Sequence, residues 1–159
     1  PADASQVAVD ARGDEAAELT GYGVWRFEDA IGWQQLTAAN ASQVALDANG
    51  DVAAAITGYG VWRFEDAGGW QQLTAADAVR VSIAGQGIVA VAIPGGGVQR
   101  FEDATGWEQL SASNASQVAV DASGDVAADL NGAGVWLFQD GLSWGQLTAA
   151  NALDVGLGD

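Results

Sequence analysis

The chain has 159 residues and a formal net charge of −16, and it contains no Lys, His, Cys or Met. These absences exclude an imidazole base, a thiolate nucleophile, a Schiff-base lysine, a disulfide and a zinc site made of Cys and His. The acidic charge argues against nucleic acid and anionic membrane surfaces as partners, because both carry negative charge. No apolar run approaches the length of a spanning helix. The start at Pro1 predicts a processed or excerpted product.

A strict repeat of 37 residues organises the sequence, with no insertion or deletion between copies. Its clearest markers are Trp33, Trp70, Trp107 and Trp144. Four full copies occupy residues 1–37, 38–74, 75–111 and 112–148, and residues 149–159 begin a fifth. A repeat of this length and fidelity indicates a solenoid, a propeller or an array. We therefore expect one repeat domain over residues 1–159.

Within one copy the apolar residues alternate as they do in strands, and the second copy shows this most clearly. It predicts strands at Gln43–Asp47, Asp51–Thr57, Val61–Asp66 and Trp70–Thr74. Asn49-Gly50 predicts a type I′ hairpin turn between the first two strands, because both central positions of that turn need positive φ. Glycine-rich turns separate the later strands. No window offers a capped helix of useful length.

Four short strands joined by hairpins form a meander, and several identical meanders form the blades of a propeller. Both faces of each predicted strand carry apolar residues, which suits blades packed between two neighbours. The predicted fold is therefore all-β, a β-propeller built from 37-residue four-stranded blades. A parallel β-solenoid is the competing architecture, and it has fewer two-residue hairpins.

Three segments of the second copy resemble a known family. They are QVALDANGDV at 43–52, GVWRF at 60–64 and GWQQL at 69–73. The pattern resembles the tectonin-type β-propeller repeat, and all four copies share it. The first half of each repeat is also similar to NHL and bacterial FG-GAP-like propeller repeats. Resemblance to tectonins implies lectin-like glycan binding, and it transfers no individual site residue.

Charged residues recur in a fixed relation on the third predicted strand of each copy. Arg26, Arg63 and Arg100 stand two residues before Glu28, Glu65 and Glu102. That spacing places both side chains on one face of a strand. In the fourth copy both change together, to Leu137 and Gln139. The joint change predicts a charge pair, laddered between blades, with a modest structural role.

The turn between the first two strands also invites a calcium interpretation. Asp47, Asn49 and Asp51 offer oxygen ligands at alternate positions, and Asp121, Ser123 and Asp125 repeat the pattern. Calcium loops place Gly at the sixth position and Glu at the twelfth, and neither is present here. Hairpin chemistry explains these residues without a metal, so we favour the turn, with calcium as the alternative and no other cofactor.

The aromatic residues are the candidate ligand contacts. Trp25, Trp62 and Trp136 share a repeat position that the third copy fills with Gln99, whereas Trp33 and its equivalents never vary. An invariant position fits packing and a variable one fits a surface ring, where indoles stack on sugar rings. Tyr22 and Tyr59 lie at turn tips and are added to the candidates. The alternative is that both tryptophan sets are buried between blades.

Two other motifs favour structural explanations. Asn40 and Asn114 begin glycosylation sequons, but Asp3 and Asp77 stand at the same repeat position, which predicts a polar turn residue. The Glu28-Asp29 carboxylates suggest a glycosidase pair. Adjacent strand residues point to opposite faces, however, and the pair recurs in later copies. We therefore predict no enzyme.

Two functions follow. The first is a non-enzymatic recognition module that binds carbohydrate in several equivalent inter-blade sites. The alternative is an assembly subunit of an extracellular homo-oligomer or filament. In this alternative, a surplus C-terminal strand pairs with another chain. That strand contains Val155 and Leu157, which in a closed four-bladed ring would compete with Val7 and Val9 for the same strand position. Expected partners are glycans or another protein chain. The acidic surface predicts an extracellular or cell-surface location.

Overall fold

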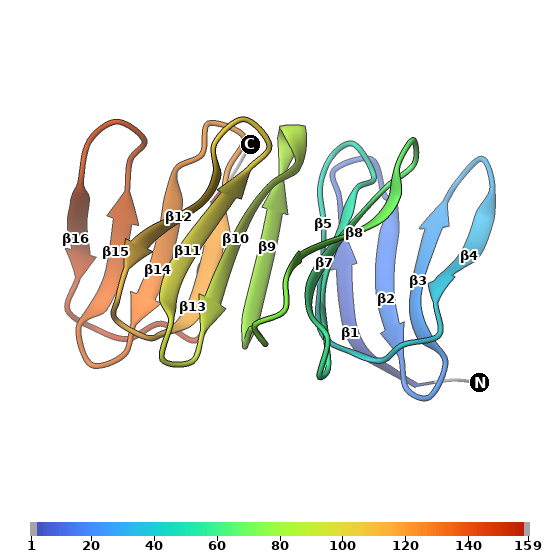
Figure 1. Ribbon diagram of the computed structural model, residues 1–159, viewed down its shortest axis with the longest axis horizontal. Coiled ribbons are helices and arrows are strands. Elements are labelled where there is room, and N and C mark those ends of the chain that lie inside the picture. Colours follow the sequence, from blue (N-terminus) through green and yellow to red (C-terminus); the bar gives the residue numbers. More distant parts are fainter. Residues whose placement is uncertain (1–2, 158–159) are drawn as a thin grey trace. The chain divides into compact units, whose positions relative to one another are not determined.

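The computed structural model describes residues 3–157, which form four antiparallel sheets of four strands each (Figure 1). The first sheet contains β1 (Ala4–Val9), β2 (Glu15–Leu19), β3 (Gly23–Glu28) and β4 (Gly32–Thr37). The second contains β5 (Ala41–Leu46), β6 (Val52–Ile56), β7 (Gly60–Glu65) and β8 (Gly69–Thr74). The third contains β9 (Arg80–Ala84), β10 (Ile88–Ile93), β11 (Gly97–Glu102) and β12 (Gly106–Ser111), and the fourth contains β13 (Ala115–Val120), β14 (Val126–Leu130), β15 (Gly134–Phe138) and β16 (Trp144–Thr148). The predicted four-strand meander is confirmed.

Two compact units divide the chain, at residues 1–77 and 78–159. The first unit holds the first and second sheets, and the second unit holds the third and fourth. We describe each unit by itself. In the part of the chain that the structure describes, no helix is long and apolar enough to cross a membrane.

The turn between β5 and β6 is longer than expected, so the predicted type I′ turn at Asn49-Gly50 is wrong. Only Gly50 has positive φ, at 87°. The Asp47 carboxylate accepts the backbone N–H groups of Asn49 at 2.8 Å and Asp51 at 3.0 Å, and these bonds hold a five-residue loop. In the third sheet, where Ala84 stands at the repeat position of Asp47, Gln86 and Gly87 both take positive φ. An aspartate side chain therefore decides which turn forms.

The next hairpin depends on a glycine that is needed both for conformation and for space. Gly60 begins β7 with φ of 80°, and an added Cβ would lie 2.1 Å from the backbone oxygen of Thr74. The crowding arises at a β-bulge between β7 and β8, where Val61 pairs with Thr74 and Trp62 pairs with Gln72. Gly134 meets the same close approach in the fourth sheet.

Each unit has its core between its two sheets. In the first unit, Ala16 and Val24 of the first sheet pack against Val44, Val52 and Ala54 of the second, together with larger partly buried side chains. The second unit repeats this arrangement, with Ala90 and Val98 facing the fourth sheet. Small residues on one sheet leave room for branched and aromatic residues on the other, which is how these apolar faces are removed from water.

The predicted Arg–Glu pair is confirmed, and the structure shows in addition that its arginine is buried. Arg26 is buried, and it forms an ion pair with Glu28 at 2.7 Å. Its guanidinium also reaches the second sheet, where it donates to the Gly50 carbonyl oxygen at 2.8 Å, pairs with Asp66 at 2.6 Å and lies over the Phe64 ring. The arginine is therefore a buried link between two sheets rather than a surface pair.

Arg100 repeats this link in the second unit. It bonds to the Gly124 carbonyl oxygen, pairs with Glu102 at 3.0 Å and Asp140 at 2.8 Å, and lies over the Phe138 ring. The laddering between blades that the repeat pattern predicted is thus present within each unit.

The C-terminal segment after β16 forms no strand at residues 149–157. It is held beside β13 by a hydrogen bond in which the Gln117 amide donates to the Leu153 carbonyl oxygen at 2.9 Å. Pairing of Val155 and Leu157 with another chain stays a prediction. The last two residues of the partial fifth repeat, 158–159, lie outside the described residues.

Candidate functional site

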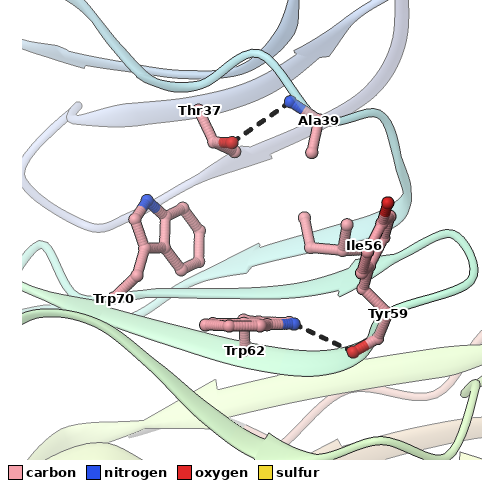
Figure 2. A pocket seen from close by; sticks show the side chains of 6 residues that line it. All are labelled: Thr37, Ala39, Ile56, Tyr59, Trp62 and Trp70. Atoms are coloured by element: carbon pink, nitrogen blue, oxygen red, sulfur yellow. Dashed lines mark hydrogen bonds between the residues drawn. The ribbon is translucent and has the colours of Figure 1, made fainter.

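A cavity of about 320 Å³ lies in the first unit, between the end of the first sheet and the aromatic face of the second. Its lining residues are Thr37, Ala39, Ile56, Tyr59, Trp62 and Trp70. Figure 2 shows Trp70 and Tyr59 on opposite sides of this aromatic pocket, with Trp62 below and Thr37 and Ala39 above. The pocket has the concave, aromatic character of a small ligand site.

The backbone of a tight turn holds Trp62 in place. The Trp62 indole N–H donates to the Tyr59 carbonyl oxygen at 2.9 Å, and the Gln72 amide donates to the same oxygen at 2.7 Å. The turn itself is anchored because one carboxylate oxygen of Asp77 accepts the N–H groups of Gly58 and Gly60. The Tyr59 side chain takes no part in this network and is 65% exposed.

The opposite wall is held by bonds between the two sheets. The Trp70 indole N–H donates to the Leu36 carbonyl oxygen at 2.9 Å. The Trp70 ring also lies edge-on to Phe64, with the ring centroids 5.4 Å apart. The Thr37 hydroxyl oxygen accepts the Ala39 N–H at 3.1 Å and closes the rim. Both indole donors of the pocket are therefore already used by the protein.

The hydrogen bonds already made by the lining residues determine which ligand groups the aromatic pocket can bind. Flat indole and phenol faces remain available, while the polar side-chain groups that line it are the hydroxyls of Thr37 and Tyr59. Of the six lining residues only Tyr59 is titratable. Such a pocket favours an apolar or flat group held by dispersion and stacking over a group that needs many hydrogen bonds.

The structure brings together only some of the predicted ligand contacts. Trp62 and Tyr59 line the same pocket. Trp25 is held in the same way, by the Tyr22 carbonyl oxygen at 3.1 Å, but it lies on the first sheet, on the face turned away from the second. Trp136 donates to the carbonyl oxygen of Ala133, a residue without an aromatic ring. The copies therefore do not present equivalent sites.

Sequence reasoning missed part of this site. Trp70 was assigned to packing because its position never varies, yet it both packs and lines the pocket. Thr37, Ala39 and Ile56 carried no signal, because their role depends on which sheet faces which.

The proposed calcium turns are occupied by backbone bonds. One oxygen of Asp47 accepts two N–H groups, and Asp121 does the same with Ser123 at 2.9 Å and Asp125 at 3.0 Å. These bonds support the hairpin interpretation of Asn49 and its neighbours. Within residues 3–157, no group of three or more His, Cys, Asp or Glu is placed to hold a metal ion.

Near the same turn, burial raises the pKa of Asp51 to about 6, and the charges of Asp47 and Glu65 add to this effect. In the equivalent turn of the first sheet, Asp10 stands at the repeat position of Asp47, and its pKa is shifted in the opposite direction. Burial opposes its ionisation, but N–H groups of Asp14 and Arg12 hold its pKa below the usual value.

Asn114 behaves as the predicted polar turn residue. Its side-chain oxygen accepts the Gly95 N–H at 2.8 Å. It also lines a smaller cavity of about 160 Å³ in the second unit, together with Val79, Ile93 and Pro94.

No protein-family model matches the chain, and no curated protein is similar to it in sequence. Solved structures are similar in fold. One is described as YCF48 bound to D1 peptide, with 15% identity, a TM-score of 0.63 and coverage of 91% of this chain and 53% of that chain. A virginiamycin B lyase from Staphylococcus aureus has 9% identity, a TM-score of 0.70 and coverage of 97% and 59%. A chain of the Mitotic Checkpoint Complex has 13% identity, a TM-score of 0.63 and coverage of 87% and 48%.

These neighbours are β-propellers, and the chain spans about half the length of each. At such low identity the likeness concerns the fold alone. The tectonin assignment is not confirmed by these comparisons. The four-stranded sheets are the blades of a β-propeller.

Proposed function

We propose that this chain is a non-enzymatic recognition module whose aromatic pocket binds an apolar, flat side chain of a protein partner. One observation carries the proposal. The pocket exposes the faces of Trp62, Trp70 and Tyr59 while both of its indole N–H groups are bonded internally. An aromatic or aliphatic side chain gains stacking and dispersion there without leaving a donor of the pocket unpaired.

The fold supports a protein ligand. One solved propeller of similar fold, YCF48, is described with a bound peptide, and another belongs to a protein complex. Tyr59 adds a third wall, because its exposed ring stands at the side of the pocket while its carbonyl oxygen is bonded to Trp62. A partner side chain entering the aromatic pocket is thereby enclosed on three sides.

The absence of an enzymatic role is part of the proposal. Acid–base catalysis needs a titratable group within hydrogen-bond reach of the substrate, and the pocket lining offers a tyrosine phenol alone. An acidic surface also fits a secreted or cell-surface module.

Carbohydrate is the second candidate ligand. It is favoured by the exposed rings of Tyr22 and Tyr59 at turn tips, because exposed aromatic faces stack on sugar rings. The hydroxyls of Thr37 and Tyr59 are the side-chain groups of the pocket that would bond to a sugar.

Peptide and glycan arrays probed with the same labelled protein separate the two candidates. We expect binding to peptides with an exposed aromatic residue, and loss of that binding in Trp62→Ala. Trp136→Ala is the matched control, because this indole has the same backbone bond but stands beside Ala133. Glycan binding that depends on Trp62 would favour the second candidate. Equal loss in both variants, or no binding to either array, would contradict a role for the aromatic pocket.

A further inference from the structure

The face that the second sheet turns toward the first sheet has an equivalent on the first sheet. Only the face of the second sheet is covered within the first unit. Val44 of the second sheet is 7% exposed, because it packs against the first sheet. Its equivalent on the first sheet, Val7, is 57% exposed, and Val9 beside it is also exposed. We call the surface formed by Val7, Val9, Trp25, Phe27 and Trp33 the open face. It carries the residues of an inter-sheet contact but has no opposing sheet in the first unit.

An unused hydrogen-bond donor lies on the open face. In each unit the invariant tryptophan of the later sheet donates to the sheet before it, from Trp70 to the Leu36 carbonyl oxygen and from Trp144 to that of Leu110. Trp33 occupies the same position on the first sheet and is 48% exposed. Within the described part of the first unit its indole N–H has no acceptor, although its ring packs on Phe27 as the equivalent rings do.

The matching acceptor lies on the fourth sheet. Leu36 and Leu110 are the extra residues at β-bulges in the outermost hairpins, which leaves their carbonyl groups free for the tryptophan. Leu147 occupies that bulge in β16 and is 62% exposed. Within the described part of the second unit, no side-chain donor reaches its carbonyl group.

Two differences in sequence distinguish these faces of the first and fourth sheets from the faces that meet within each unit. The fourth sheet has half-buried Leu137 at the repeat position of Arg26, which lies over the Phe64 ring of the next sheet, so its equivalent face is apolar rather than cationic there. The first sheet has Glu15 at the position of fully buried Val52. A carboxylate at this position opposes burial of the open face, because removing a charge from water costs free energy.

We propose that the open face docks on the fourth sheet of a second copy of this chain, with a hydrogen bond from the Trp33 indole N–H to the Leu147 carbonyl oxygen. The contact reproduces between chains the arrangement seen twice within them. It joins two different faces and is therefore heterologous, so that each copy offers one donor face and one acceptor face. Glu15 makes the association weak and dependent on concentration.

Sedimentation equilibrium over a range of concentrations tests this contact. We expect the wild-type mass to rise with concentration, and Glu15→Val to associate about tenfold more tightly. Val7→Asp should abolish association and Trp33→Phe should weaken it about tenfold. Val7 and Trp33 are exposed, so both variants should fold. Leu142→Asp, an equally exposed apolar residue on a loop outside the open face, is the control and should change nothing.

The indole N–H resonance of Trp33 gives a second readout. It should shift with concentration in the wild type and in Leu142→Asp, but stay fixed in Val7→Asp. A monomer at every concentration, for the wild type and for Glu15→Val alike, would overturn the proposal and indicate that another segment or protein covers the open face. Self-association that Val7→Asp and Trp33→Phe leave unchanged would also overturn it. None of these variants alters the aromatic pocket, so the two proposals fail independently.

Discussion

The second and fourth sheets have the same arrangement of four strands, the same two tryptophan positions and a close-packed glycine at the same place. They differ at one turn, which in the second sheet borders the aromatic pocket. Trp62 and Trp136 each donate to a carbonyl oxygen of that turn, from Tyr59 in one sheet and Ala133 in the other. The backbone therefore holds the indole whichever side chain the turn carries. Scaffold and ligand chemistry are thus encoded by different atoms of the same residue, and changes to one should leave the other intact.

The largest expected effect is on the shared scaffold. Gly60→Ala places a Cβ against the Thr74 oxygen in a positive-φ conformation, and we expect it to lower the free energy of unfolding by about 3 kcal/mol or more. Gly58→Ala is the control, since it has the same sign of φ but open space, and should cost about 1 kcal/mol. Urea unfolding measures both. Gly134→Ala should match Gly60→Ala, and a much smaller effect there would break the equivalence of the two sheets.

The buried arginine comes next. Arg26→Leu copies the residue that the fourth sheet has at position 137 and removes the bonds to the Gly50 oxygen and Asp66. We expect a loss of about 2 kcal/mol in the free energy of unfolding, since charge-assisted bonds are lost but the remaining carboxylates are partly solvated. Arg12→Leu, whose side chain is largely exposed, should cost little. Comparable losses for the two variants would refute the role of Arg26 as a link between sheets.

Exchanging the side chains at positions 59 and 133 should transfer binding of an aromatic group from the second sheet to the fourth. Tyr59→Ala should weaken binding of an aromatic peptide about tenfold by removing one stacking wall, without changing the free energy of unfolding by more than about 0.5 kcal/mol. Ala133→Tyr should raise binding by the fourth sheet in a Tyr59→Ala background. Isothermal titration with one array-selected peptide measures both. If Tyr59→Ala binds as well as the wild type, the turn does not set the ligand chemistry.

The smallest effect concerns pH. The pKa of Asp51 is raised to about 6 in the folded state, so the folded state holds this proton more tightly than the unfolded state does. The contribution of Asp51 to the free energy of unfolding should therefore fall as pH rises from about 4 to about 6. Asp51→Asn should be more stable than the wild type at pH 7 by about 1 kcal/mol or less, because partial solvation screens the charge.

Urea unfolding of the wild type and of Asp51→Asn at pH 4 and pH 7 measures the difference in their free energies of unfolding. This difference should vanish at pH 4. Asp125→Asn, the same turn position in the fourth sheet, is the control. An equal gain in both variants would show that the effect does not come from the surroundings of Asp51.

Much of the architecture could be predicted from local patterns. Alternation between Trp62 and Arg63 assigned them to opposite faces of β7, and the paired loss of arginine and glutamate in the fourth copy indicated their contact. Both depend on residues close in sequence, where the geometry of a strand dictates direction. The turn at Asn49 failed because the Asp47 side chain competes with the hairpin for backbone N–H groups, and propensity alone does not show which wins.

The sequence by itself therefore determined the repeat, the four-stranded blades and the faces on which the aromatic and arginine side chains lie. Only the tertiary structure decided that Thr37 and Ala39 meet Trp62 and Trp70 in one pocket, that Arg26 is buried, and that Trp33 has no acceptor among the described residues of its own unit. The reason is physical. A repeating sequence makes every copy look equivalent, whereas burial and hydrogen-bond partners depend on which sheet packs against which, and within a unit each sheet turns only one face to its neighbour.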